Sequence, residues 1–160
     1  MNYNSQVMSL ENTSINPSKI EDCSEILSLI KELAIYEKEP NAVKNTESGL
    51  QKTLFCNHPN VFSLSVKQDQ KIIGFALYFF TYSTWTGNKT LYLEDFYLQE
   101  KYRQSGIGQL VFNKLKTIAN THNCKRLELS VLKWNEPALN FYKKNQMKEQ
   151  SEWASFRLEL

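Results

Sequence analysis

The chain has 160 residues, of which 41% are hydrophobic and 12% aromatic, and its 19 basic and 17 acidic residues give a net charge of +2. This length fits one domain, and the composition excludes a disordered chain. The near balance of charges excludes the strong one-signed field that nucleic-acid and anionic-membrane binders use, so we expect no nucleic-acid or membrane partner.

Residues 1–12 are polar and lack the basic start and apolar core of a secretory signal, so we expect a flexible extension before a single domain over 13–160. The three cysteines, Cys23, Cys56 and Cys124, are widely spaced and odd in number. This pattern predicts neither a disulfide framework nor a metal site. We therefore expect reduced thiols, a cytoplasmic location and no bound metal.

In the first half of the chain, the hydrophobic pattern predicts a strand, two helices and a hairpin. Thr13 to Ile15 predict a short strand, and apolar residues at helical spacing then predict a helix to about Tyr36. A second helix is expected from about Thr46 to Cys56. Val61 to Val66 and Ile72 to Tyr82 are rich in strand formers and flank a polar turn, which indicates an antiparallel hairpin.

The second half alternates strands with helices. Thr90 to Leu98 alternates as a strand, Arg103 to Gly108 leads into an amphipathic helix, and Arg126 to Leu132 predicts a buried strand. Pro137 fits the first turn of a further helix, and Phe156 to Leu160 predicts a closing strand. The order indicates an α/β or α+β protein, with a mixed sheet and helices on its faces.

The segment Arg103 to Gly108 has the pattern Arg-x-x-Gly-x-Gly between a strand and a helix. Backbone N–H groups at a helix N-terminus favour a phosphate, and glycine permits close approach or unusual backbone angles. A glycine pair before a helix is also typical of a plain turn. A dinucleotide motif fits poorly, because it requires glycine or alanine where Val111 stands.

Three ordered segments, Leu91 to Phe96, Tyr102 to Gly108 and Trp134 to Tyr142, together resemble the GNAT acetyltransferase superfamily. Within it, the chain is similar to the diamine acetyltransferases, which include the spermidine/spermine N1-acetyltransferases and the thialysine N-acetyltransferases. The resemblance runs from about Ile15 to Leu158. It implies a GNAT fold, with a mixed, mostly antiparallel sheet of about six or seven strands and helices on both faces. It also implies a homodimer.

The resemblance implies acetyl-CoA as co-substrate. The loop would hold the coenzyme pyrophosphate, the strand backbone would pair with the pantetheine arm, and the guanidinium of Arg103 would add a charge partner for phosphate. The strand side chains would equally serve as core, and Asn135 as a helix cap. The implied coenzyme-binding residues are Phe96, Tyr97, Leu98, Arg103, Gln104, Ser105, Gly106, Ile107, Gly108, Gln109, Asn135, Glu136, Pro137 and Ala138.

Two residues match the catalytic positions of the family. Tyr142 would act as general acid toward the departing thiolate, and a phenol keeps its proton at neutral pH. The alternative is a core aromatic. Glu94 would draw the proton from the amine or would only anchor the cation. Asp95 follows it and points to the opposite face of a regular strand, unless a bulge intervenes.

The substrate implied by the resemblance is a primary amine on a small cation, either a polyamine such as spermidine or a thialysine-like or lysine-like amino acid. Ser83 stands where the polyamine-specific pattern has an acid, which favours the thialysine branch. Two other functions stay open, a catalytically silent acetyl-CoA-binding module and a protein or peptide N-acetyltransferase. The implied substrate-binding residues are Tyr36, Glu37, Trp85, Glu94, Glu128, Leu129, Ser130 and Glu152.

Overall fold

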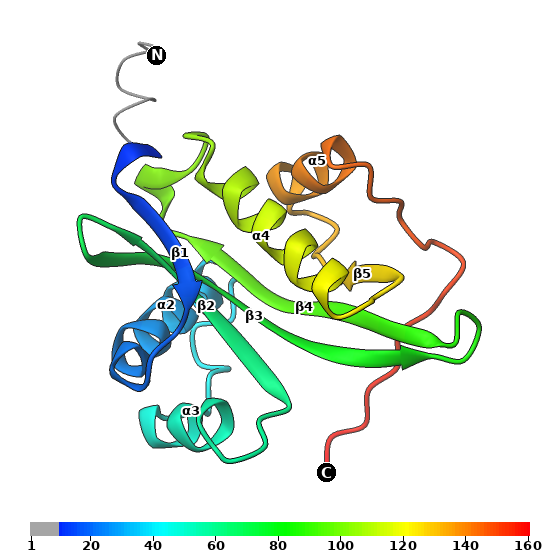
Figure 1. The fold of residues 1–160 in the computed structure, drawn as a ribbon, viewed down its shortest axis with the longest axis horizontal. Helices are drawn as coiled ribbons and strands as arrows, with labels where there is room; N and C mark the ends of the chain where they lie inside the picture. The colour runs from blue at the N-terminus through cyan, green and yellow to red at the C-terminus, as the bar shows by residue number, and fades with distance from the viewer. Residues whose placement is uncertain (1–9) are drawn as a thin grey trace. The chain divides into compact units, whose positions relative to one another are not determined.

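The structure is a computed structural model, and it describes residues 10–160. Backbone contacts divide the chain into two compact units, the first ending at Leu129 and the second beginning at Ser130. The second unit has one helix, α5 (Glu136–Lys144). The first unit contains β1 (Thr13–Pro17), η1 (Ile20–Asp22), α2 (Cys23–Tyr36), α3 (Glu47–Leu54), β2 (Val61–Gln68), β3 (Lys71–Ser83), β4 (Asn88–Leu98), η2 (Glu100–Tyr102), α4 (Ile107–Thr121) and β5 (Arg126–Leu129) (Figure 1).

The described strands form a single sheet in the order β1-β2-β3-β4-β5. Neighbours are antiparallel except β4 and β5, which are parallel. The structure therefore confirms an α+β fold with a mostly antiparallel mixed sheet. The β2–β3 hairpin was also predicted, and its turn uses left-handed backbone at Asp69 and Gln70 (φ 48° and 69°), which suits a two-residue connection.

The predicted number of strands was too high, because the described residues form five strands and not six or seven. The predicted strand from Phe156 to Leu160 has no regular structure, and its side chains at Phe156, Leu158 and Leu160 are exposed. Alternating apolar residues suit a strand, but a strand forms only where another edge pairs with it. In residues 10–160 no such partner strand lies beside this segment.

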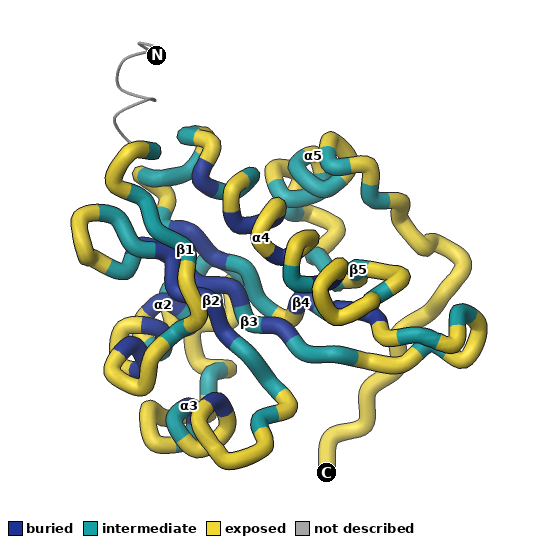
Figure 2. Tube along the Cα trace, viewed as in Figure 1, coloured by how far each residue is buried: buried dark blue, intermediate teal, exposed yellow. Residues whose placement is uncertain are grey.

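Helices cover both faces of the sheet in the first unit (Figure 1). On one face, α2 and α3 pack with the sheet in a cluster that includes Cys23, Ile26, Leu50, Phe75 and Tyr97; we call it the α2 core. On the other face, α4 packs against a cluster that we call the α4 core, whose members include Leu64, Ile73, Leu91, Leu93, Val111 and Leu115. Figure 2 shows the buried residues concentrated along the central strands. Strand β4 therefore lies within a sheet that is packed on both faces.

A buried ion pair joins the start of α2 to β2. Asp22 is only 6% exposed, and its Oδ1 accepts a hydrogen bond of 2.8 Å from Nζ of Lys67. Its Oδ2 accepts from the backbone N–H of Lys19 at 2.9 Å and from the hydroxyl of Ser65 at 2.8 Å. The carboxylate thereby caps η1 and has partners on both of its oxygens, as a buried charge requires.

Candidate active site

Strand β4 contains a bulge at Glu94. Leu93 keeps a regular partner on β3, and Asp95 pairs with Leu77, so Glu94 has no partner in the register. The side-chain alternation changes at the same place, because Leu93 lies in the α4 core and Tyr97 lies in the α2 core. In a regular strand, residues 93, 95 and 97 would share one face. The extra residue turns Asp95 and Tyr97 toward α2.

The bulge changes the expected surroundings of the acidic pair. Leu77 packs against the α2 core, and directly opposed residues of antiparallel strands project on the same side, so Asp95 faces α2. Burial raises the pKa of Asp95 to about 6, with further contributions from the negative charges of Glu94 and Glu37. Glu94 is exposed. Asp95 is therefore a half-buried carboxyl group beside a residue predicted to contact the amine.

Arg103 contacts residues at the end of α2 and on β4. Its guanidinium lies 4.7 Å from the ring centre of Tyr36 and 5.3 Å from that of Tyr97, and its Nε donates to the carbonyl of Leu98 at 2.8 Å. The hydroxyl of Tyr97 in turn donates to Glu32 of α2 at 3.2 Å. The predicted amine end of α2 and the predicted coenzyme strand thus meet in one cluster. A contact of Arg103 with phosphate stays a prediction.

Glu37 is the residue that follows α2, and it marks the amine side of the predicted site. The helix ends here because Glu37 leaves helical geometry and Lys38 adopts a left-handed conformation (φ 66°). Burial raises the pKa of Glu37. Its negative charge acts on Asp95, so the structure brings the end of α2 and the bulge of β4 together.

The pairing of β4 with β5 ends early. It covers only Thr90 to Leu93, opposite Arg126 to Leu129, and β4 continues past this point to Leu98. The predicted pantetheine segment, Phe96 to Leu98, lies in this continuation. Strands that run past a neighbour are where extended ligands add by backbone hydrogen bonds.

The loop before α4 has the backbone geometry of an anion site. Gly106 is the N-cap of α4, with a φ of 92°, and Gln104 is also left-handed (φ 59°). The hydroxyl of Ser105 donates to the carbonyl of Tyr102 at 2.6 Å, which holds the loop against η2. The first turn of α4 contains no acidic residue to repel an anion. A phosphate at this 15-residue helix would meet its positive end.

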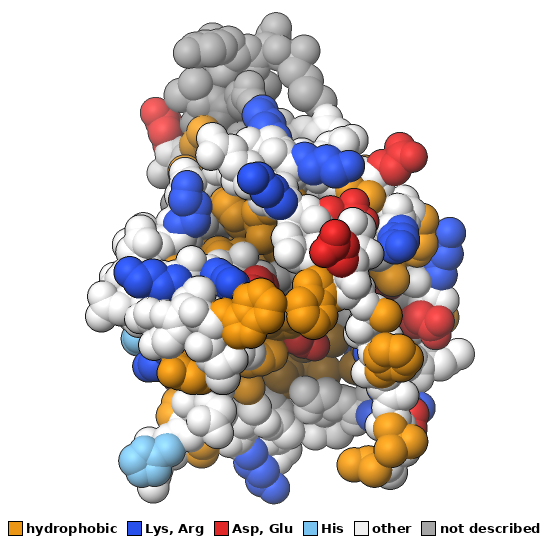
Figure 3. Space-filling view, turned by 90° about the vertical axis from the view of Figure 1, so that its right-hand side faces the viewer, with side chains coloured by type: hydrophobic (Ala, Val, Ile, Leu, Met, Phe, Trp, Pro, Cys, Tyr) orange, Lys and Arg blue, Asp and Glu red, His pale blue; other side chains and the backbone are white. Residues whose placement is uncertain are grey.

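The structure does not bring Trp85 to the bulge. Trp85 lies in the turn between β3 and β4 and is 81% exposed. From Asn88, where β4 begins, to Glu94 the strand extends about 20 Å. Tyr82, near the same turn, is also exposed. Figure 3 shows one side of the molecule, on which hydrophobic, basic and acidic side chains are mixed.

Two predicted substrate residues lie on β5. Glu128 pairs with Tyr92 and Leu129 with Leu93, so both are near the start of the β4 continuation. Glu128 also makes an exposed ion pair of 3.6 Å with Arg126. Their contact with an amine stays a prediction.

The second unit contains the remaining predicted residues. The side chain of Asn135 accepts a hydrogen bond of 3.3 Å from the backbone of Ala138, so Asn135 does cap α5, and Pro137 lies in the first turn after Glu136. Burial raises the pKa of Tyr142 to about 12, which keeps its phenol protonated. Ser130 and Glu152 lie outside α5 and are exposed.

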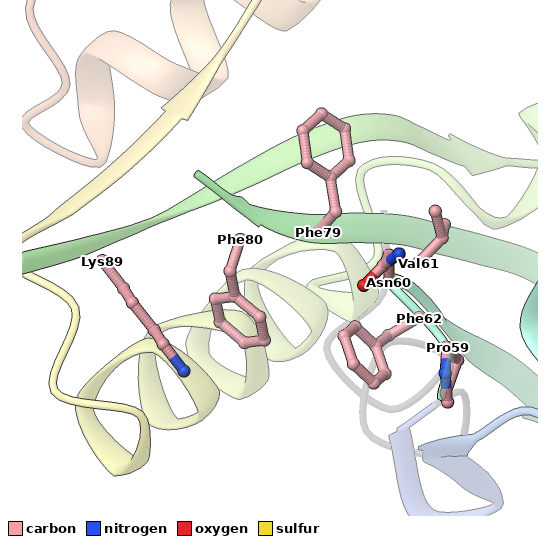
Figure 4. Close-up of a pocket in the computed structure, with 7 residues that line it drawn as sticks. All are labelled: Pro59, Asn60, Val61, Phe62, Phe79, Phe80 and Lys89. Carbon is pink, nitrogen blue, oxygen red and sulfur yellow. The ribbon is translucent and has the colours of Figure 1, made fainter. Parts of the chain in front are cut away.

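A hollow of about 540 Å³ opens at the end of β2 and β3 (Figure 4). Phe80 projects into it, close to Lys89, whose Nζ is 5.5 Å from the ring centre. Phe79 projects from the other side of β3, as strand alternation requires. None of the predicted site residues lines this hollow, which is formed by Pro59, Asn60, Val61, Phe62, Phe79, Phe80 and Lys89.

Within residues 10–160, no group of three or more His, Cys, Asp or Glu side chains is placed to hold a metal ion. The same part of the chain has no helix with the length and apolar character needed to span a membrane. The three cysteines are free thiols, with Cys23 buried and Cys56 exposed.

Residues 25–146 match the acetyltransferase (GNAT) family. The chain belongs to this family. It is 35% identical to thialysine N-epsilon-acetyltransferase of Mus musculus over 94% of both chains, and 37% identical to the Sus scrofa enzyme of the same name over 91% of both. It is also 39% identical to spermidine/spermine N(1)-acetyltransferase-like protein 1 of Homo sapiens, over 84% of this chain and 20% of that one.

Solved structures agree with this fold. An integron cassette protein from the mobile metagenome of V. cholerae has 27% identity and a TM-score of 0.77, over 92% of this chain and 93% of that one. An aminoglycoside acetyltransferase from an uncultured soil metagenomic sample has 18% identity and a TM-score of 0.79, over 94% of this chain and 98% of that one. The second likeness shows the fold alone.

GNAT acetyltransferases use acetyl-CoA as co-substrate, and the first unit has features that fit this molecule. The left-handed backbone at Gly106 and the acid-free first turn of α4 suit a pyrophosphate. The continuation of β4 past β5 suits an extended arm. When bound, acetyl-CoA would supply an activated thioester.

Replacing Gly106 with alanine is expected to weaken coenzyme binding by about tenfold, which corresponds to about 1.4 kcal/mol. The cause is the backbone, because φ is 92° and a Cβ would meet only Leu10, at 3.7 Å. The matched control is Gly87→Ala, which also has a positive φ (62°) but lies in the β3–β4 turn with nothing within 4 Å. Both variants should lose about 1 kcal/mol of stability. Calorimetric titration with acetyl-CoA should separate them, and equal coenzyme affinities would contradict the role of the loop.

Sequence reasoning did not identify Asp95 as a half-buried acid of the site. A signal was present, since the inward apolar residues change from Leu91 and Leu93 to Phe96 and Leu98, a shift of one position that only a bulge explains. Glu32 was also missed, because a single acid on a helix carries no such signal.

Proposed function

We propose that this protein transfers the acetyl group of acetyl-CoA to a primary amine of a small cationic substrate. The observation that carries the proposal is β4 itself. Its continuation past β5 leads into the loop of Gly106 on the coenzyme side, and its bulge turns the carboxyl group of Asp95 to the α2 side, where the charge of Glu37 acts on it. Carboxylates near a thioester suit a cationic amine that must lose a proton before it attacks.

The reaction needs one bond formed and one broken. The ammonium first loses one proton, and the amine nitrogen then bonds to the carbonyl carbon of the thioester as the carbon–sulfur bond breaks. A second proton leaves the nitrogen and, through solvent, restores the phenol of Tyr142. Glu94 serves the amine, as proton acceptor or as anchor. Tyr142 gives its phenolic proton to the departing thiolate, and with a pKa of about 12 the phenol carries this proton at neutral pH. No covalent intermediate with the enzyme is required.

The remaining predicted residues divide between the two ligands. The residues Phe96 to Leu98, Arg103 to Gln109 and Asn135 to Ala138 hold the coenzyme. We expect Tyr36, Glu37, Glu128, Leu129, Ser130 and Glu152 to contact the amine, whereas Trp85, in the turn before β4, lies far from the bulge. A single catalytic domain over residues 13–160, preceded by the extension 1–12, stays a prediction, and residues 1–9 of the extension lie outside the described part of the chain. A homodimer stays a prediction from the family resemblance, and a cytoplasmic location stays a prediction from the cysteine pattern.

Ser83→Asp is expected to raise the preference for spermidine over thialysine by about tenfold. The polyamine-specific pattern of the family has an acid at this position, and one charge-assisted contact with a polycation contributes about 1.5 kcal/mol. The hydroxyl of Ser83 accepts from the N–H of Thr86 at 3.3 Å, which an aspartate oxygen can also do, so the turn should persist. The measurement is kcat/KM for both amines. An unchanged ratio would mean that this position does not select substrate.

A panel of amines tests the proposed function. The protein and acetyl-CoA are incubated with spermidine, thialysine, lysine or a peptide, and free thiol is measured. The proposal expects thiol release that depends on a small cationic amine. Release with peptides alone would favour a protein or peptide acetyltransferase. Coenzyme binding without release on any amine would indicate a catalytically silent module and refute the proposal.

A further inference from the structure

Asp95 is a half-buried carboxyl group that no other side chain neutralises. Within residues 10–160 the carboxyl group of Asp95 has no hydrogen bond or ion pair. The carboxylate of Asp22, in contrast, accepts hydrogen bonds from three donors. The charged groups that act on it are Glu94 of its own strand and Glu37 at the end of α2, and both are negative. Its partner on β3, Leu77, is apolar. A carboxylate that is desolvated among like charges is unfavourable unless a cation joins it.

The bulge is what gives Asp95 this environment. Without the extra residue, Asp95 would share a face with Leu93 in the α4 core, away from Glu37. With it, Asp95 lies on the side of α2, in the strand that continues past β5. Bulges commonly redirect a side chain beside an active site, at some cost in strand pairing. The bulge therefore decides on which face of the sheet the carboxyl group of Asp95 lies.

We propose that Asp95, rather than Glu94, accepts the proton that leaves the attacking amine, and that the exposed Glu94 binds the cation. This inference rests on the proposed function and assigns a further catalytic residue to it. In the step, one proton of the substrate ammonium moves to a carboxylate oxygen of Asp95, and the nitrogen lone pair that this frees then bonds to the carbonyl carbon of the thioester. The proton later passes from Asp95 to solvent.

The acid–base properties of Asp95 support this role. An efficient base has a pKa near the working pH, and burial with two negative neighbours brings the pKa of Asp95 from 3.8 to about 6. This narrows the difference in pKa between the carboxyl group and an alkyl ammonium by about two units, which makes the proton transfer less unfavourable.

Two isosteric variants, Asp95→Asn and Glu94→Gln, test the inference through the pH dependence of kcat/KM. The wild type should show an acidic limb near pH 6, because Asp95 must lose its proton before it can accept one. Asp95→Asn should abolish this limb and lower kcat/KM by about 100-fold, with coenzyme affinity unchanged. Glu94→Gln should keep the limb but move it to lower pH, because one negative charge beside Asp95 is gone. Its KM for the amine should rise.

The outcomes separate the two proposals. Loss of the limb in Glu94→Gln, or its retention in Asp95→Asn, would overturn the assignment to Asp95. A wild type that acetylates no amine would refute the proposed function and this inference with it. Folding is checked independently, since Asp95→Asn removes an unpaired charge and should be at least as stable as the wild type at pH 8. A less stable variant would mean that the carboxylate has a structural partner, and would contradict the inference.

Discussion

Replacing Tyr142 with phenylalanine should lower kcat by about 100-fold while leaving coenzyme binding unchanged. The substitution removes only the hydroxyl that protonates the thiolate, and general acids contribute about 100-fold to 10,000-fold. We expect the lower end, because burial raises the pKa of Tyr142 to about 12, and a phenol with a higher pKa is a weaker acid. The high pKa also means that the wild-type proton is not lost at any ordinary assay pH.

The measurement for this prediction is steady-state turnover together with calorimetric binding of acetyl-CoA. Phe141→Leu is a matched control, since its ring contacts that of Tyr142 at 5.3 Å but carries no proton to donate. Equal kcat values for Tyr142→Phe and the wild type would remove the catalytic role and leave Tyr142 as a packing residue. Loss of coenzyme affinity in Tyr142→Phe would indicate a binding role instead.

Asp22→Ala should lower the free energy of unfolding by about 3 kcal/mol. The change leaves the ammonium of Lys67 without its partner and removes acceptors from the N–H of Lys19 and the hydroxyl of Ser65. Breaking a buried pair by removing one partner costs about 3–5 kcal/mol, and we expect the lower value because the Lys67 side chain is 26% exposed and reaches water. Urea unfolding measures the loss.

The control for Asp22 is the exposed pair of Arg126 and Glu128. Arg126→Gln should change stability by less than about 1 kcal/mol, because both side chains are more than 40% exposed. A loss as large as that of Asp22→Ala would contradict the distinction between the two pairs. So would a loss below about 1 kcal/mol for Asp22→Ala.

The Asp22 pair also gives stability a pH dependence. Burial acts to raise the pKa of Asp22, but the bonds from Lys67, Lys19 and Ser65 outweigh it, and the pKa lies below the usual 3.8. The unfolded state therefore binds the proton at a higher pH than the folded state. The contribution is fully present above pH 3.8 and is lost as the pH falls through the folded pKa. In Asp22→Ala this acid-dependent loss should disappear.

Local patterns in the sequence predicted most of the fold. The β2–β3 hairpin, the loop into α4 and the cap of α5 by Asn135 all depend on residues close together in the chain, so their propensities decide the structure. The prediction of a strand from Phe156 to Leu160 was wrong because its pairing does not depend on nearby residues. Its alternation is real, but pairing depends on a distant edge that a local pattern does not specify.

The site shows the same division. Glycines and a helix start predicted the loop of Gly106, because those features act locally. The position of Asp95 depends on a bulge in the β3–β4 register, and the contact of Arg103 with Tyr36 depends on packing between distant segments. A regular strand would place Asp95 on the face of Leu93, and the sequence left open whether a bulge intervenes. The aromatic rings beside Arg103 come from α2 and β4, which the charge pattern of the loop does not specify.

Direct acetyl transfer to the amine is tested by mass analysis of all products after the protein is mixed with isotope-labelled acetyl-CoA and the best amine of the panel. We expect one labelled acetyl group on a primary nitrogen of the amine, one free thiol for each acetyl transferred, and no label on the protein. Label retained on the protein, on Cys124 for example, would contradict direct attack by the amine. An amine that gains no label while coenzyme binds would contradict the central claim of acetyl transfer.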